Sequence, residues 1–199
     1  MVWDKVSGVY DFFETVYNGK VYNGTGVIAA EELEPRDRVL ECACGTGAIR
    51  VYLAPKCRSL TITDMSKGML YEAEKKCRRF TNVRVRKADL TNLRVPDGSF
   101  DKVVAGNVIH LLDDPEKAVA ELVRVCKKGG KVIIPTYINK EKISAEGATK
   151  LIGLLGVDFK REFTLESYRQ FFADAGYENV SYKIAEGRMP CAVAVITKD

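Results

Sequence analysis

The stretch Val39-Leu40-Glu41-Cys42-Ala43-Cys44-Gly45-Thr46-Gly47 decides the fold class of this 199-residue chain, because it joins an apolar strand to a glycine turn. Gly45 and Gly47 carry no Cβ, so the backbone can bend tightly there and lie against a ligand. Residues 48–54 are predicted to be helical up to Pro55, with free backbone N–H groups directed at the turn. Such a turn is typical of a site for a nucleoside-bearing cofactor, although ordinary strand–helix connections contain it too.

Acidic residues follow the next two predicted strands. The strand at residues 59–64 ends in Asp64, 17 positions after Gly47, where a carboxylate can accept hydrogen bonds from both hydroxyls of a ribose. A helix cap for the segment from Ser66 is the alternative role of Asp64. The strand at residues 83–88 ends at Asp89-Leu90, which is suitably placed to meet an adenine edge. A fourth strand, residues 100–105, leads to Asn107 and His110.

These residues resemble the class I S-adenosylmethionine-dependent methyltransferases, and within them the small-molecule branch that includes the ubiquinone and menaquinone C-methyltransferases. Ala43 departs from the family pattern because a glycine is usual there, and Lys128 replaces a proline before Gly129-Gly130. The resemblance covers nearly the whole chain, with matching stretches at residues 38–47, 60–70, 86–90, 96–112, 121–134 and 163–180.

The resemblance implies a fold, a cofactor and a reaction. The expected fold is α/β, a Rossmann-like doubly wound and mostly parallel seven-stranded sheet with an antiparallel C-terminal hairpin strand, in a single domain over residues 1–199. The expected cofactor is S-adenosyl-L-methionine, and the expected reaction is direct in-line methyl transfer to a small-molecule acceptor (EC 2.1.1.-).

By the same resemblance, specific residues would hold this cofactor. The methionine moiety would lie against Gly45, Thr46 and Gly47, with Glu41 near its ammonium group. Asp64 would hold the ribose, and Met65 would pack on the adenine face. The adenine edge would meet Asp89 and the Leu90 backbone, and Asn107 would face the methionyl part.

The acceptor side is less defined. His110 is the candidate general base, since its reference pKa is near neutral and it lies three residues after Asn107. Its alternative role is to cap or pack the short helix there. Tyr10, Tyr17 and Tyr22 are candidate residues of the acceptor pocket, and aromatic core residues are the alternative.

The remaining segments complete the expected domain. Residues 3–34 are predicted to form a helical region, so that residues 1–34 make an N-terminal cap. Pro115–Cys126 has apolar residues at helical spacing and is expected to stop before Gly129-Gly130, with a strand at residues 131–135. The insert at residues 137–163 is a candidate lid, or else a helix packed on the sheet. Residues 179–185 and 191–197 alternate as two hairpin strands.

Two other functions fit the turn. An NAD(P)-dependent oxidoreductase would need a small residue at Arg50 to complete its glycine fingerprint, and arginine there would obstruct close packing of helix on strand. A non-catalytic protein that binds a nucleoside cofactor is the second alternative. Detectable turnover with any acceptor would exclude it.

Composition and charge favour a compact soluble enzyme of the cytoplasm. Hydrophobic residues make up 46% of the chain, and Lys plus Arg exceeds Asp plus Glu by only 31 − 27 = 4. A basic cluster within residues 75–87 suggests nucleic acid, but it lacks interleaved aromatics apart from Phe80, so a solvated face is preferred and no nucleic-acid partner is expected. No leader peptide is expected, because Asp4 and Lys5 break the stretch from Met1 to Val9, and no membrane span is expected, because no apolar run approaches 18 residues.

Six cysteines and a single histidine are spaced unlike any zinc-binding motif, so no metal is expected. The cysteines are interpreted as reduced thiols that mostly fill core space. Thiols that grip a soft substrate such as arsenic, as in one methyltransferase branch, are the functional alternative. The oligomeric state and the acceptor are not encoded in any recognisable pattern.

Overall fold

The computed structural model describes residues 19–47, 49–139, 160–187 and 189–199. Residues 19–31 form a helix, which agrees with the predicted N-terminal helical region where the two overlap. Tyr10, Tyr17 and most of the candidate lid at 137–163 lie outside the described residues.

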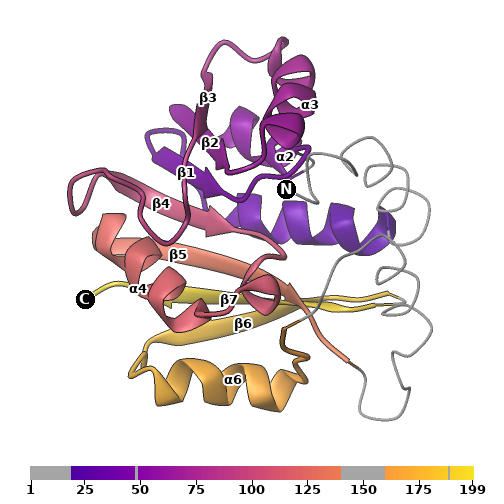
Figure 1. Ribbon diagram of the computed structural model, residues 1–199, viewed down its shortest axis with the longest axis vertical. Coiled ribbons are helices and arrows are strands. Elements are labelled where there is room, and N and C mark those ends of the chain that lie inside the picture. The colour runs from indigo at the N-terminus through magenta and orange to yellow at the C-terminus, as the bar shows by residue number, and fades with distance from the viewer. Residues whose placement is uncertain (1–18, 48, 140–159, 188) are drawn as a thin grey trace.

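A seven-stranded sheet forms the centre of the molecule (Figure 1), with strand order β3-β2-β1-β4-β5-β7-β6. Parallel pairing joins β3, β2, β1, β4 and β5, whereas β7 pairs antiparallel with both β5 and β6. The predicted doubly wound sheet with one antiparallel hairpin strand is therefore confirmed. The strands are β1 Arg38–Cys42, β2 Ser59–Asp64, β3 Val83–Lys87, β4 Phe100–Ala105, β5 Cys126–Tyr137, β6 Val180–Ala185 and β7 Cys191–Thr197.

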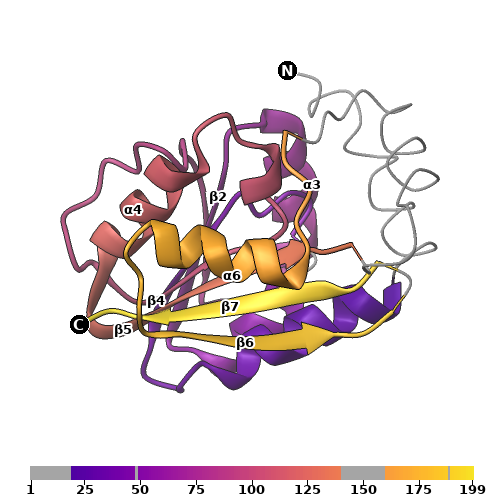
Figure 2. The same cartoon turned by 90° about the horizontal axis from the view of Figure 1, so that it is seen from below.

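Helices cover both faces of this sheet, as Figure 2 shows. On one face pack the helix at residues 19–31, α2 (Arg50–Leu53) and α3 (Lys67–Cys77), over apolar side chains such as Leu60 and Ile62. On the other face pack α4 (Pro115–Val125), α6 (Leu165–Asp174) and the short 3₁₀ turn η2 (Ile109–Leu111), over Leu40 and Val103. Burial on both faces explains why the central strands are nearly continuous in apolar residues.

The segment after α4 differs from the prediction. The helix ends at Val125, close to the expected Cys126, but Gly129-Gly130 does not separate it from the next strand, because β5 begins at Cys126 and includes both glycines. The pairing with β4 is irregular between Phe100 and Lys102, which lets β5 start opposite Phe100. At Gly130 a Cβ would lie 2.6 Å from the Asp101 carbonyl oxygen, so this glycine permits a close approach of strands rather than a helix stop.

The helix after the glycine turn is also shorter than predicted. Only Arg50–Leu53 is α-helical, and a 3₁₀ turn, η1 (Ala54–Lys56), follows directly. Pro55 has no N–H to donate to the carbonyl four residues earlier, so the α-helical ladder cannot continue there.

Candidate functional site

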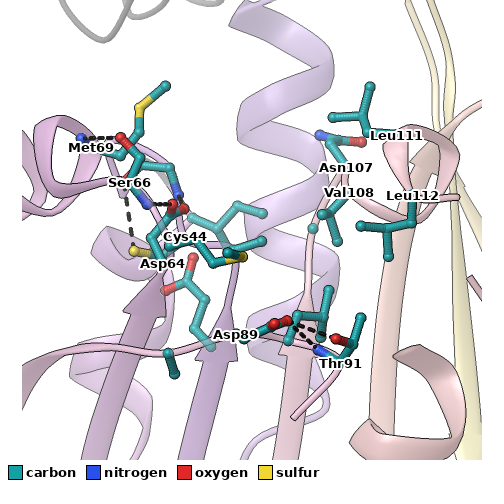
Figure 3. Close-up of a pocket in the computed structure, with 18 of the residues that line it drawn as sticks. Cys44, Asp64, Ser66, Met69, Asp89, Thr91, Asn107, Val108, Leu111 and Leu112 are labelled. Carbon is teal, nitrogen blue, oxygen red and sulfur yellow. Dashed lines mark hydrogen bonds between the residues drawn. The ribbon is translucent and has the colours of Figure 1, made fainter. Parts of the chain in front are cut away.

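One cavity opens where the parallel strands β1, β2, β3 and β4 end (Figure 3), at the edge of the sheet where their carboxyl ends meet. It collects most of the cofactor residues predicted from the sequence. Its described lining is Tyr22, Glu41, Ala43, Cys44, Gly45, Ile49, Asp64, Met65, Ser66, Met69, Ala88, Asp89, Leu90, Thr91, Gly106, Asn107, Val108, Leu111 and Leu112.

The glycine turn forms one wall of this cavity. Its backbone has positive φ at Ala43 (49°), Gly45 (53°) and Gly47 (81°). No atom lies within 4 Å of the position that a Cβ on Gly45 would take, so a ligand can approach this backbone closely. Ala43, which stands where the family pattern has glycine, adopts the left-handed conformation that glycine tolerates best.

Asp64 fixes the turn to the end of β2. Its Oδ2 accepts a hydrogen bond from the Gly45 N–H (2.9 Å), and its Oδ1 accepts one from the Ser66 N–H (2.8 Å). The N-cap of α3 is Ser66, whose Oγ accepts from the Met69 N–H, so the alternative that Asp64 itself caps this helix is wrong. These two hydrogen bonds join the glycine turn to the residue that begins α3.

Asp89 lies on a different wall, after β3. Its Oδ1 accepts from both the N–H and the hydroxyl of Thr91, each at 2.8 Å, which holds the loop in place. The second carboxylate oxygen has no hydrogen-bond partner in the described part of the chain. Leu90 is buried beside it, while Met65, which follows β2 and also lines the cavity, is 43% exposed and offers an apolar face.

Glu41 lies deepest among the acidic residues and is 2% exposed. Burial raises the pKa of Glu41 to about 8, the positive charge of Arg50 lowers it, and Asp64 raises it. Its Oε2 has no hydrogen-bond partner within the described residues, and the same holds for Nε and Nη2 of Arg50. The cavity therefore contains a carboxyl group that can ionise when a cation arrives.

From the sequence, a side chain as large as that of Arg50 is expected to obstruct the packing of helix on strand, but in the structure Arg50 fits behind the turn. It is fully buried, and its Nη1 donates to the Thr46 carbonyl (2.9 Å). A Cβ on Gly47 would lie 1.1 Å from that Nη1, so the guanidinium fills the space that this glycine leaves. Thr46 and Gly47 consequently support the turn from behind and are not among the described lining residues.

His110 is not among the described lining residues either. It is buried in η2, where its Nδ1 lies 2.8 Å from Thr136 Oγ1. Burial lowers its pKa to about 4, so the ring is neutral at physiological pH. Its carbonyl accepts from the N–H groups of Lys160 and Arg161. These contacts favour the packing role over direct contact with an acceptor.

Several lining residues were not singled out from the sequence. Ser66, Met69 and Thr91 each lie within four residues of a predicted position, so proximity to Asp64 or Asp89 could have found them. Leu111 and Leu112 follow His110 and have no local signal of their own. Of the three tyrosines proposed for the acceptor, Tyr22 lines the cavity.

Comparisons with known proteins agree with this geometry. The profile of the methyltransferase domain family matches residues 40–134, from β1 through most of β5. The ubiquinone/menaquinone biosynthesis C-methyltransferase UbiE of Rickettsia massiliae is 32% identical over 177 residues, which cover 75% of this chain and 71% of that protein. The chain belongs to the class I S-adenosylmethionine-dependent methyltransferases.

Other relatives of this methyltransferase carry different activities in their names. Phosphatidylethanolamine N-methyltransferase of Cereibacter sphaeroides is 34% identical over 138 residues, covering 67% of this chain and 66% of that protein. Phosphoethanolamine N-methyltransferase 1 of Arabidopsis thaliana is 25% identical and aligns with 100% of this chain but 44% of its own length. The chain thus spans about two thirds of the length of the first of these relatives and less than half of the length of the second.

Solved structures show the same fold. A SAM-dependent methyltransferase from Thermotoga maritima superposes with a TM-score of 0.76 at 24% identity, covering 100% of this chain and 99% of the other. One from Aquifex aeolicus gives a TM-score of 0.71 at 18% identity, with 96% of this chain and 98% of the other covered.

In the described ranges of the chain, no helix combines the length and the apolar character that crossing a bilayer requires.

Proposed function

We propose that this protein transfers a methyl group from S-adenosyl-L-methionine to a small-molecule acceptor. The observation that carries the proposal is the acidic lining of the cavity. Glu41, Asp64 and Asp89 line it, and the described lining contains no lysine, arginine or histidine. The cofactor of the family has two positive groups, a sulfonium and an ammonium, and a single carboxylate, so its charge complements this lining.

The same charge argues against a dinucleotide. The pyrophosphate of NAD or NADP carries negative charge, and the described cavity opposes it with carboxyl groups and offers no cationic side chain. The relatives are methyltransferases and lend no support to the oxidoreductase alternative.

Specific residues would hold the cofactor in the way that the sequence suggested. The Gly45 backbone would lie against the methionine moiety, with Glu41 facing the ammonium group and Asp64 facing the ribose hydroxyls. Met65 would pack on the adenine, and the free oxygen of Asp89 would accept from its amino group. When bound, S-adenosylmethionine supplies a methyl group already activated by the positive sulfur.

For the transfer itself, this chain's contribution would be alignment and exclusion of water. The wall made by Val108, Leu111 and Leu112 is apolar and lies opposite Asp64 (Figure 3). With His110 buried behind this wall, we propose that the acceptor arrives as a competent nucleophile, such as a neutral amine, a thiolate or a stabilised carbanion.

The six cysteines are free and buried, as expected of core-filling thiols. Since disulfides are rare in reducing compartments, this supports a cytoplasmic location for the enzyme as part of the proposal.

Ligand-induced shifts of the melting temperature test the proposal. S-adenosylmethionine, S-adenosylhomocysteine, NAD and NADP are compared at equal concentration, and a ligand at 100 times its dissociation constant stabilises by roughly 2.7 kcal/mol. The two adenosyl ligands are expected to raise the melting temperature, and the dinucleotides are not. A larger shift with NAD or NADP would refute the cofactor assignment.

Turnover is then screened with ethanolamine phospholipids, small amines, quinols and thiols as acceptors, by release of S-adenosylhomocysteine. Asp64→Asn is the matched variant, because it preserves shape and removes one carboxylate. It is expected to lower both affinity for S-adenosylhomocysteine and turnover. Product release by wild type with any acceptor would exclude the non-catalytic alternative.

A further inference from the structure

The backbone of Asn107 is held in an unusual conformation at the end of β4. Its φ is +53°, which asparagine tolerates better than most residues, and its N–H donates to the Pro135 carbonyl (2.8 Å). The residue lines the cavity and is 9% exposed. The backbone of Asn107 is thus fixed by a hydrogen bond, and the orientation of its side-chain amide depends on a separate contact.

Cys191, at the start of β7, fixes the orientation of the Asn107 amide. The Cys191 thiol is fully buried and donates to Asn107 Oδ1 at 3.7 Å, closer than its other acceptor, the Ala192 carbonyl at 3.9 Å. Burial raises the pKa of Cys191 to about 12, so the thiol keeps its proton at neutral pH and remains a donor. The hydroxyl of Thr25, from the helix at residues 19–31, is in hydrogen-bonding contact with the same thiol.

Because the thiol takes the amide oxygen, the amide nitrogen is directed to the cavity. Figure 3 shows Asn107 on the wall opposite Asp64 and Ser66, with its nitrogen turned toward them. In the described structure this nitrogen has no hydrogen-bond partner. The other side-chain donors of the described lining are engaged: Cys44 donates to the Gly45 carbonyl, Thr91 donates to Asp89, and Tyr22 and Ser66 have interactions of their own.

We infer that Cys191 is a positioning residue that aims the Asn107 amide N–H group at the carboxylate of the bound cofactor. The inference rests on the proposed function. Asn107 is the neutral donor that the acidic cavity needs, because the described lining presents carboxyl groups to the cofactor's positive groups and has no cationic side chain for its one negative group.

The position of Asn107 in the sheet selects the amino-acid end of the cofactor. Ala105 of β4 is paired with Cys42 of β1, so the residues that follow these two strands lie side by side. Asn107 is therefore next to the turn that begins at Ala43, on the Glu41 side of the cavity and away from the adenine wall at Asp89. A carboxylate there would accept from Asn107 while the ammonium faces Glu41.

Two ligands and four variants test this inference by calorimetry, without an acceptor. S-adenosylhomocysteine has the amino-acid carboxylate, whereas 5′-methylthioadenosine lacks the whole amino-acid end. Cys191→Ala should weaken S-adenosylhomocysteine about tenfold, the low end for a hydrogen bond to a charged group, and change 5′-methylthioadenosine less than about twofold. Cys191→Ser retains a donor and should restore the affinity to within about threefold. Asn107→Asp should weaken S-adenosylhomocysteine at least as much as Cys191→Ala, and adding Cys191→Ala to it should cause no further loss.

Cys126→Ala is the matched control, since Cys126 is also fully buried and donates to a carbonyl oxygen, that of Asp101, at 3.8 Å. It should lower the melting temperature as Cys191→Ala does, with affinity for both ligands unchanged. Equal affinity for S-adenosylhomocysteine in wild type and Cys191→Ala would overturn the inference, and so would an equal loss for both ligands. If Cys191→Ala does not fold, Cys191→Ser and Asn107→Asp carry the same comparison. A wild-type protein that binds neither ligand would instead refute the proposed function.

Discussion

Replacing Ala43 by glycine should stabilise this protein, although it removes a methyl group. Ala43 has φ = +49° in the turn after β1, where a Cβ crowds the following carbonyl. An L-residue pays roughly 1–2 kcal/mol for this conformation, and glycine does not. The protein thus carries strain beside the cavity that a single substitution removes.

The size of the gain follows from three opposing contributions. Relief of the left-handed conformation gives about 1.5 kcal/mol. Against it, glycine costs about 0.5–1 kcal/mol because its unfolded chain is freer. Ala43 is only half-buried, so loss of its methyl group costs a few tenths of a kcal/mol, less than the ~0.8 kcal/mol of a fully buried methylene. The net expectation for Ala43→Gly is a gain of about 0.5 kcal/mol, and at most about 1 kcal/mol.

Urea unfolding at constant pH measures this gain, with the midpoint rising at unchanged slope. Ala120→Gly is the matched control, because Ala120 is exposed within α4 and loses the same methyl group in a helical conformation. It should cost about 1 kcal/mol. If Ala43→Gly destabilises as much as Ala120→Gly, Ala43 is not left-handed in solution and the account of the turn is wrong.

Three further predictions concern the same region. Gly47→Ala should destabilise the protein clearly more than Gly45→Ala in urea unfolding, because both have positive φ but only a Cβ on Gly47 meets Arg50, at 1.1 Å; equal losses would contradict the buried position of Arg50. Burial raises the pKa of Glu41 from 4.5 to about 8, so its contribution to stability is fully present below about pH 4.5 and is lost as the pH rises through 8. Glu41→Gln should therefore flatten the fall in unfolding free energy between pH 5 and pH 8, and an identical slope in both proteins would show that Glu41 does not titrate there. His110→Ala should lower stability by about 2 kcal/mol, because the buried Thr136 hydroxyl loses its partner, and should leave the calorimetric affinity for S-adenosylhomocysteine within a factor of a few; a turnover loss of about 100-fold in the folded variant would instead establish His110 as the base.

Local pattern was sufficient for the strands and for the acidic residues that follow them. The predicted strands at residues 59–64, 100–105 and 191–197 agree with β2, β4 and β7, because residues buried on both faces leave continuous apolar runs. Asp64, Asp89 and Asn107 could be assigned to one site, since the carboxyl ends of parallel strands meet at one edge. No contact between distant residues had to be known for this.

Local pattern failed where a partner strand or a missing N–H controls the backbone. Gly129-Gly130 is typical of a helix end, yet both glycines belong to β5, because their backbones exchange hydrogen bonds with that of Lys198, directly after β7. Similarly, the helix after the turn is reduced to Arg50–Leu53 by Pro55 and the 3₁₀ turn around it. His110 was proposed from its distance to Asn107 along the chain, and the fold buries it against Thr136.

The sequence alone determined the order of the elements, the class of cofactor and the identity of many residues that line the cavity, because these depend on periodicity and on short spacings. Only the tertiary structure decided the state of those residues. The left-handed Ala43, the protonated Glu41 and the Asn107 amide held by a thiol 84 residues away all depend on which groups the fold brings together and removes from water. Desolvation and long-range contact are properties of the packed chain, and no local pattern of residues encodes them.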